Sequence, residues 1–222
     1  MLFIPAFKDI EAASRLISPH VHRTPVLTSK QLDAISGARL FFKCENFQKV
    51  GAFKFRGATN AVLNLTEGQR AAGVVTHSSG NHAAALAHAA VSRGVKAFIV
   101  MPSSAPEVKK RAVAGYGAEI TFCEPTLAAR EAAAAEVIGR TGATMIHPYD
   151  NFYIIAGQGT AAMELLEEVP DPDAVLAPVG GGGLLSGSAI ATRHMAPSAK
   201  IYGAEPLLAD DAARSLRTGA IQ

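Results

Sequence analysis

The stretch "GVVTHSSGNHAAALAHAAVSRGVKAFIVMP", residues 73–102, decides the fold. It opens and closes with short apolar runs, at 73–79 and 96–102, that are typical of buried strands. Between them lies an alanine-rich stretch at 81–93 with the composition of a helix. A strand, a helix and a second strand predict two parallel strands joined by a crossover helix. The sequence therefore predicts an α/β fold with parallel sheets covered by helices on both faces.

The same alternation continues on both sides of this stretch. Further strands are expected at 38–45, 118–124, 143–149, 174–180 and 199–205. Helices are expected at about 55–66, 81–93, 106–115, 127–140, 154–168 and 184–195. We find no internal repeat, low-complexity tract or long flexible linker. Any division into domains must therefore lie between closely packed lobes.

Composition excludes several classes of protein. The chain has 222 residues, of which 49% are hydrophobic and 18% are charged, which is ample for a buried core. Its formal net charge of +2 is too small to argue for nucleic acid or an acidic membrane surface as a partner, and we expect neither. No apolar run is long enough to span a bilayer, and the first residues lack a signal-peptide pattern. Cys44 and Cys123 lie in apolar runs outside any CxxC pair, which predicts buried free thiols and a cytoplasmic protein.

Parallel sheets bind ligands beyond the carboxyl ends of their strands, so the residues that follow each strand are the first candidates. The strand at 73–79 runs into a polar turn made of Ser78, Ser79, Gly80 and Asn81. This turn either binds a ligand or only starts the next helix, with Asn81 as its cap. His82 and His88 show no metal-ligand spacing and fit a helix surface.

The strand at 174–179 leads into four glycines, Gly180, Gly181, Gly182 and Gly183. Four consecutive glycines expose their amides at the positive end of the following helix, which favours a phosphate cradle over a flexible turn. The loop has neither the spacing of a Walker A motif nor that of a dinucleotide fingerprint.

The strand at 199–204 leads into three carboxylates, Glu205, Asp210 and Asp211. Such a group suits Mg²⁺, Mn²⁺ or Ca²⁺. The other interpretation is N-capping of a helix by Asp210 or Asp211. Spacing alone favours capping.

Lys54 lies between Phe53 and Phe55 where a helix begins. Either its amine snorkels into water, or apolar surroundings keep it near neutral as a nucleophile or base. A phosphate cradle without a nucleotide fingerprint, together with such a lysine, indicates a phosphorylated cofactor that bonds to an amine. Pyridoxal 5′-phosphate meets both requirements.

At these residues the sequence resembles the fold type II (tryptophan synthase β-like) pyridoxal-phosphate enzymes, in the serine/threonine dehydratase (ammonia-lyase) and serine racemase group. Six motifs appear in family order: "RTPVLTS" (23–29), "KCENFQKVGAFKFRGATNAV" (43–62), "SSGNHAAALA" (78–87), "IAGQGT" (155–160), "PVGGGGLLSG" (178–187) and "AEPLLADDAARS" (204–215). The resemblance implies a large cofactor-binding lobe from 1–50 and 147–222 and a small lobe from 51–146. It also implies a homodimer.

The resemblance implies a role for each motif residue. Lys54 would hold the cofactor as a Schiff base, Phe53 would pack near its ring, and Asn81 would bond the ring hydroxyl. Gly180, Gly181, Gly182 and Gly183 would bind the phosphate. The substrate carboxylate would be held by Ser78, Ser79, Gly80, Asn81 and His82. A divalent cation would be held by Glu205, the carbonyl of Ala209 and Asp211, which reverses the preference for capping.

The implied reaction is the conversion of a hydroxyamino acid, such as L-serine or L-threonine, to a 2-oxo acid and ammonia. Lys54 would remove the Cα proton. Ser79 would lie on the opposite ring face and permits racemisation as well, so serine racemase and 3-hydroxyaspartate dehydratase are alternatives. A nucleotide-dependent oxidoreductase is disfavoured because the dinucleotide fingerprint is missing.

The resembled chains run on well beyond the point where this sequence stops, at "TGAIQ". The additional part supplies a Ser or Thr that faces the pyridine nitrogen, and no residue here takes that role. We therefore expect an incomplete large lobe with an exposed apolar face, an unpaired strand edge and poor solubility or association. The alternative from another class is an inactive fragment that only binds or associates, although the intact Lys54 and glycine loop argue against it.

Overall fold

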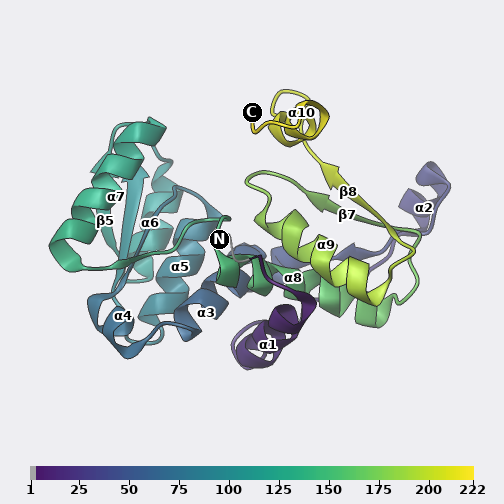
Figure 1. Ribbon diagram of the computed structural model, residues 1–222, viewed down its shortest axis with the longest axis horizontal. Helices are drawn as coiled ribbons and strands as arrows, with labels where there is room; N and C mark the ends of the chain where they lie inside the picture. Colours follow the sequence, from purple (N-terminus) through teal and green to yellow (C-terminus); the bar gives the residue numbers. More distant parts are fainter. Residues whose placement is uncertain (1–3) are drawn as a thin grey trace.

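The computed structural model describes residues 4–222 and is a mixed α/β structure (Figure 1). The helices are α1 (Phe7–Ile17), α2 (Lys30–Ser36), α3 (Lys54–Leu63), α4 (Glu67–Ala72), α5 (Asn81–Val91), α6 (Glu107–Gly115), α7 (Leu127–Thr141), α8 (Phe152–Glu168), α9 (Gly183–Met195) and α10 (Asp211–Thr218). The strands are β1 (Val26–Leu27), β2 (Phe42–Lys43), β3 (Val74–His77), β4 (Ala97–Pro102), β5 (Glu119–Cys123), β6 (Thr144–Met145), β7 (Ala174–Pro178) and β8 (Lys200–Ala204).

The stretch that predicted the fold forms the centre of a four-stranded parallel sheet. Its strand order is β5-β4-β3-β6, and α5 is the crossover between β3 and β4. Every residue of β4 is buried because both faces of this sheet are covered. Ile99 packs with Leu86 of α5 on one face, and Val100 packs with Val137 of α7 on the other. The α/β prediction is confirmed.

A second parallel sheet consists of β7 and β8 and lies at the other end of the molecule, with α8 and α9 (Figure 1). Its inner face packs on these helices through residues such as Val175 and Leu166. On its outer face Leu176 and Tyr202 are partners in register and remain 68% and 49% exposed. This face has the exposed apolar character that the sequence predicts.

Several short elements differ from the predictions. The strands expected at 38–45 and 143–149 contain only two residues each, and β2 pairs with β1 in an antiparallel arrangement. Helices α1, α2, α4 and α10 were not predicted as separate elements. Capping contacts rather than long apolar stripes define α2, which begins where Leu32 N donates to Ser29 Oγ and ends at the left-handed Gly37.

The two cysteines are free but only partly buried, so the prediction of buried thiols is wrong. The Sγ of Cys44 lies 3.3 Å from the carbonyl oxygen of Phe42. Cys123 ends β5, which lies at one edge of the four-stranded sheet. A position at a strand end near a sheet edge leaves a side chain partly open to solvent even within an apolar run.

A buried ionic network joins segments that are far apart in the sequence. The Arg56 guanidinium, which is 0% exposed, donates to both Glu45 (2.8 Å) and Glu164 (2.6 Å). Lys43 Nζ lies 2.8 Å from the other oxygen of Glu164, and Thr160 Oγ1 accepts from Arg56 at 3.2 Å. The network therefore fixes the first turn of α3 against β2 and α8.

Candidate active site at the β3–β6 switch point

The strand order places the crevice of the four-stranded sheet between β3 and β6. From β3 the chain moves outward through β4 to β5, and it then returns to pair β6 with the other side of β3. Ligands of parallel sheets bind at such a reversal of strand order, beyond the carboxyl ends of the strands. Residues 78–81 follow β3 and residues 146–151 follow β6, so these two loops border the crevice.

Lys54 is the first residue of α3 and its amine lies among loop atoms at this crevice. Its Nζ donates to the carbonyl oxygen of Pro148 at 2.7 Å and lies 5.3 Å from the ring centroid of Phe53. Phe55 is buried and stacks on His88 instead. Burial lowers the pKa of Lys54 from its ordinary 10.5 to about 8. The structure thus favours the reactive amine over the snorkelling one.

We expect the reactivity of Lys54 to rise with a midpoint near pH 8. Its pKa is lowered, so the neutral nucleophilic amine persists at a pH where a model-peptide lysine, with a pKa of about 10.4, is protonated. Competitive labelling with an amine-acylating reagent across pH 6.5–11, read by peptide mass spectrometry, measures this profile. A Lys54 profile that coincides with that of a lysine peptide in the same tube would contradict the prediction.

The turn before Lys54 is strained. It consists of two short 3-10 turns, Glu45–Phe47 and Lys49–Gly51. Within the second turn Val50 adopts φ 58°, in the left-handed region that a β-branched side chain rarely occupies. Strain of this kind costs about 1–3 kcal/mol and is found most often at functional sites.

His82 lies in the core directly behind the crevice. It is 2% exposed, and its Nε2 lies 3.2 Å from the carbonyl oxygen of Ile146. Burial, followed by the charge of Lys54, lowers the pKa of His82 to about 3, so its imidazole is neutral. The helix-surface interpretation is therefore wrong for His82. His88 is only half-buried, and its ring stacks between Phe55 and Tyr116.

The turn after β3 presents small polar groups to the crevice. Gly80 N donates to Ser78 Oγ at 3.3 Å, and Ser79 is half-buried. Asn81 is exposed and is the first residue of α5, whereas Gly80 stands at the cap position without a side-chain cap. Asn81 therefore does not cap the helix, and its amide is available for a ligand.

The glycine loop has the geometry of an anion cradle. Helix α9 begins at Gly183, and Gly182 precedes it with φ 84°, a conformation that glycine adopts readily. No atom lies within 4 Å of the place where a side chain would start at Gly180 or Gly182, so that space is open. The loop leads directly into the positive end of α9, which favours an anion there.

Residues 146–151 connect these parts, and the sequence analysis did not select them. The ring of Tyr149 fills the space where a side chain of Gly181 would lie, and its carbonyl oxygen would be 2.9 Å from a Cβ on Gly183. The ring also packs edge-on against His147. Through Pro148 and Tyr149 this segment contacts both Lys54 and the glycine loop. Only residues 150 and 151 follow the strand expected at 143–149, so the sequence signal covered just the end of this segment.

The acidic residues after β8 have other partners in this structure. The two carboxylate oxygens of Glu205 accept from Ala212 N (3.0 Å) and Ala213 N (2.8 Å), at the start of α10. Asp210 pairs with Arg214 and Arg217 on the same helix. Capping by Asp210 or Asp211 is thus wrong in detail, because Glu205 is the capping group. Among residues 4–222 we find no cluster of three side chains placed to hold a metal.

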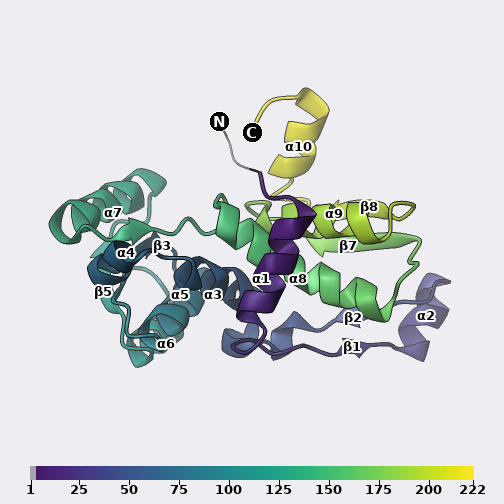
Figure 2. The same cartoon turned by 60° about the horizontal axis from the view of Figure 1, so that its bottom comes forward.

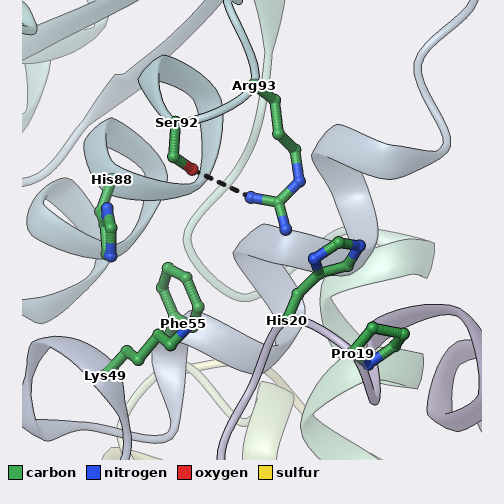
Figure 3. Close-up of a pocket in the computed structure, with 7 residues that line it drawn as sticks. All are labelled: Pro19, His20, Lys49, Phe55, His88, Ser92 and Arg93. Carbon is green, nitrogen blue, oxygen red and sulfur yellow. Dashed lines mark hydrogen bonds between the residues drawn. The ribbon is translucent and has the colours of Figure 1, made fainter.

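A cavity of about 250 Å³ lies next to Phe55 (Figure 3). It is lined by Pro19, His20, Lys49, Phe55, His88, Ser92 and Arg93. Burial, then the charge of Arg93, lowers the pKa of His20. None of the predicted catalytic or cofactor-binding residues lines this cavity. The candidate active site is therefore the crevice at Lys54 and not this cavity.

Comparison with known proteins agrees with the chemistry of the crevice. The family described as "Pyridoxal-phosphate dependent enzyme" matches residues 17–222. The chain belongs to the pyridoxal-phosphate dependent enzyme family. It is 51% identical over 220 residues to the beta-hydroxyaspartate dehydratase of Paracoccus denitrificans, with 99% of this chain and 70% of the relative covered. It is 51% identical over 215 residues to the serine racemase of Dictyostelium discoideum, with 97% and 66% covered.

A solved structure supports the same family assignment. Maize serine racemase superposes with a TM-score of 0.97 at 48% identity, covering 99% of this chain and 67% of that one. The chain thus spans about two thirds of the length of the relatives it matches.

The residues at the crevice fit pyridoxal phosphate. The cofactor requires an amine that can lose its proton, and burial lowers the pKa of Lys54 to about 8, so a larger fraction is neutral near pH 7 than for an ordinary lysine. It also requires a phosphate cradle, and the open space above Gly180 and Gly182 at the start of α9 provides one. The crevice therefore offers the two groups that pyridoxal phosphate needs, an amine to bond the cofactor and a cradle to bind its phosphate.

Proposed function

We propose that this protein catalyses the β-elimination of a hydroxyamino acid, such as L-serine, L-threonine or 3-hydroxyaspartate, to a 2-oxo acid and ammonia. The observation that carries the proposal is the partly buried Lys54 amine, with its pKa lowered to about 8, beside the Pro148 carbonyl oxygen at the crevice between the loops after β3 and β6. The dehydratase and racemase names of relatives about half identical in sequence support the same substrate class.

Each residue of the crevice has a role in this proposal. Lys54 would hold the cofactor through its amine, and the same amine would take the proton from the substrate Cα. Ser78, Ser79 and the first amides of α5 hold the substrate carboxylate at the positive end of that helix. The glycine loop would bind the phosphate, Asn81 would contact the ring hydroxyl, and Phe53 would pack beside the ring. When bound, the cofactor supplies an electron-withdrawing ring that stabilises negative charge at Cα.

The buried, neutral His82 has a supporting place in this arrangement. Its contact with the Ile146 carbonyl oxygen ties the start of α5 to the loop after β6. It can therefore contribute to substrate binding by fixing the turn that holds the carboxylate.

The proposal is tested by incubating the protein and cofactor with each of the three amino acids and measuring ammonia and 2-oxo acid. Equal amounts of the two products, formed only when cofactor is present, support β-elimination. Cofactor binding without any turnover of the three substrates would favour an inactive binding or association fragment.

Serine racemisation is the second candidate, favoured by the serine racemase relatives and by the hydroxyl of Ser79. A racemase needs acid–base groups on both faces of the substrate plane, and Ser79 would be the group opposite Lys54. We expect Ser79→Ala to lower D-serine formation from L-serine by about 10²-fold or more, the typical contribution of a general acid or base. Pyruvate formation should change less than about tenfold, because elimination needs Lys54 as its only base and Ser78 and the amides of α5 would still hold the carboxylate.

Chiral chromatography and a pyruvate assay on the same samples measure both products. Equal losses of D-serine and pyruvate would contradict a face-specific role for Ser79. Ser78→Ala is the matched comparison: this residue of the same turn would hold the carboxylate but supply no proton, so its loss should lower D-serine and pyruvate by equal factors.

We also propose that Glu205, the carbonyl of Ala209 and Asp211 bind a divalent cation such as Mg²⁺, Mn²⁺ or Ca²⁺. The ion would compete with the amides of Ala212 and Ala213 for the Glu205 oxygens. Ligand binding stabilises the folded state, so millimolar Mg²⁺ should raise the thermal unfolding midpoint and a chelator should reverse it. The same midpoint with and without Mg²⁺, Mn²⁺ and Ca²⁺ would refute the cation site.

The remaining features of the proposal concern organisation. We propose a large lobe formed by 1–50 and 147–222 and a small lobe formed by 51–146, consistent with the four-stranded sheet coming wholly from the latter. We propose a homodimer, which analytical ultracentrifugation tests, and a cytoplasmic location. In residues 4–222 no helix combines the length and apolar character needed to cross a membrane.

A further inference from the structure

Helix α8 lies between the helix that carries Lys54 and the helix that follows the glycine loop. It packs on α3 and on α9, and α1 crosses it (Figure 2). Its sequence "GQG" places Gly157 and Gly159 two residues apart, which is about 200° around a helix. The two glycines therefore lie on opposite sides of α8, one toward α3 and the other toward α9.

On the α3 side the two helix backbones are in contact. A Cβ on Gly157 would lie 2.6 Å from the Cα of Gly57 and 3.0 Å from the carbonyl oxygen of Arg56. A Cβ on Gly57 would in turn lie 2.8 Å from the carbonyl oxygen of Ile154. Gly57 N also donates to the fully buried Gln158 Oε1 at 3.2 Å. The first turn of α3, which begins with Lys54, is thus held directly on α8.

On the α9 side the contact is equally close. A Cβ on Gly159 would lie 2.9 Å from the carbonyl oxygen of Gly187 and 2.6 Å from Ile10 Cδ1. A Cβ on Gly187 would lie 2.6 Å from Gly159 N. Gly187 is four residues after Gly183, where α9 begins. The start of α9, and with it the glycine loop, is therefore also held on α8 by backbone contact.

We propose that Gly157 and Gly159 of α8, with their partners Gly57 and Gly187, are positioning residues that set the separation between the Lys54 amine and the phosphate-binding amides of the glycine loop. The inference rests on the proposed function, because it concerns the cofactor that would join these two groups. One rigid molecule bonded at one end and held by phosphate at the other needs a fixed distance between them. Two glycine contacts on opposite sides of one helix provide such a distance.

The effect of a methyl group follows from these distances. Van der Waals contact needs about 3.4 Å or more, so a Cβ placed 2.6 Å from a backbone atom must push the helices apart by close to 1 Å. Binding groups need to be held within about 0.5 Å of their productive positions, and a displacement of about 1 Å can cost 10²-fold. The displacement should therefore lower the affinity for a ligand that is held at both ends more than the affinity for a ligand that is held at one end alone.

The experiment compares two probes, pyridoxal 5′-phosphate and pyridoxal, which lacks the phosphate. Dissociation constants are measured by absorbance titration of the full 222-residue chain and of Gly157→Ala and Gly187→Ala. The dissociation constant of pyridoxal divided by that of pyridoxal 5′-phosphate reports how much the phosphate adds to binding at Lys54. We expect this ratio to fall about tenfold or more in both variants, while pyridoxal alone binds within about twofold of wild type.

Gly139→Ala in α7 is the matched control, because nothing lies within 4 Å of its added Cβ, and its ratio should equal that of wild type. Far-ultraviolet circular dichroism establishes that each variant is folded. If one is not, Gly159→Ala combined with Ile10→Ala replaces it, since the shorter Ile10 side chain leaves the Gly187 oxygen as the close neighbour.

The outcomes separate the inference from the function on which it rests. An unchanged ratio in the folded variants overturns the inference. A merely structural role predicts this result, because it would weaken the binding of both probes equally. No covalent absorbance band with either probe in the wild-type chain would instead overturn the proposed function.

Discussion

Lys54→Ala will abolish covalent binding of pyridoxal phosphate and lower the rate of 2-oxo acid formation by at least about 10³-fold. A general base alone contributes about 10²–10⁴-fold, and this residue is also the one that bonds the cofactor. The amine is suited to both tasks because burial lowers its pKa to about 8. Steady-state assays of ammonia release, with absorbance spectra of the same preparations, measure the two losses.

The control for this variant is Lys30→Ala. Lys30 is an exposed residue at the start of α2, so its loss should leave activity and spectrum unchanged. A Lys54→Ala protein that keeps the absorbance band and more than a tenth of the activity would show that another amine performs the chemistry.

The second large effect concerns stability rather than chemistry. We expect Glu164→Gln to lower the free energy of unfolding by about 3–5 kcal/mol, the cost of removing one partner from a buried ion pair. Glu164 contacts both Arg56 and Lys43, and the Arg56 side chain is 0% exposed. Urea denaturation followed by circular dichroism measures the difference. Glu167→Gln is the control, since its partner Arg23 is exposed and such pairs contribute about 0–1 kcal/mol.

The same network predicts a dependence on pH. Burial disfavours the charged form of Glu164, but hydrogen bonds from Arg56 and Lys43 outweigh it, so the pKa of Glu164 lies below its ordinary value. Its stabilisation is therefore complete above the unfolded pKa of about 4.3 and is lost as the pH falls through the lower folded value. The stability gap between wild type and Glu164→Gln should thus shrink in acid. A gap that is constant from pH 7 to pH 3 would contradict this assignment.

The sequence was sufficient for the parts of the fold that depend on local pattern. Apolar strands alternating with alanine-rich helices predicted the α/β class, and the glycines and Lys54 stood out because their residue types are unusual where they occur. The reactive state of Lys54 was not fixed by its neighbours alone. It depends on burial against the loop that contains Pro148, which is distant in sequence.

The missed features have identifiable physical causes. Residues 146–151 were overlooked because a strand was predicted over 143–149, whereas β6 contains only two residues and the loop begins sooner. The Arg56 network escaped notice because Glu45 and Glu164 become neighbours only when α3 packs on α8. The capping role was assigned to Asp210 or Asp211 because these residues adjoin the start of α10. In the structure the more distant Glu205 folds back and accepts from the amides of that helix.

The central claim is that Lys54 is the amine that bonds pyridoxal phosphate. The most direct measurement is borohydride reduction of the protein with bound cofactor, followed by proteolysis and mass spectrometry of the peptides. We expect the mass of the reduced cofactor on the peptide that contains Lys54 and on no other. Cofactor on a different lysine, or spread over several exposed lysines with Lys54 unmodified, would contradict the claim.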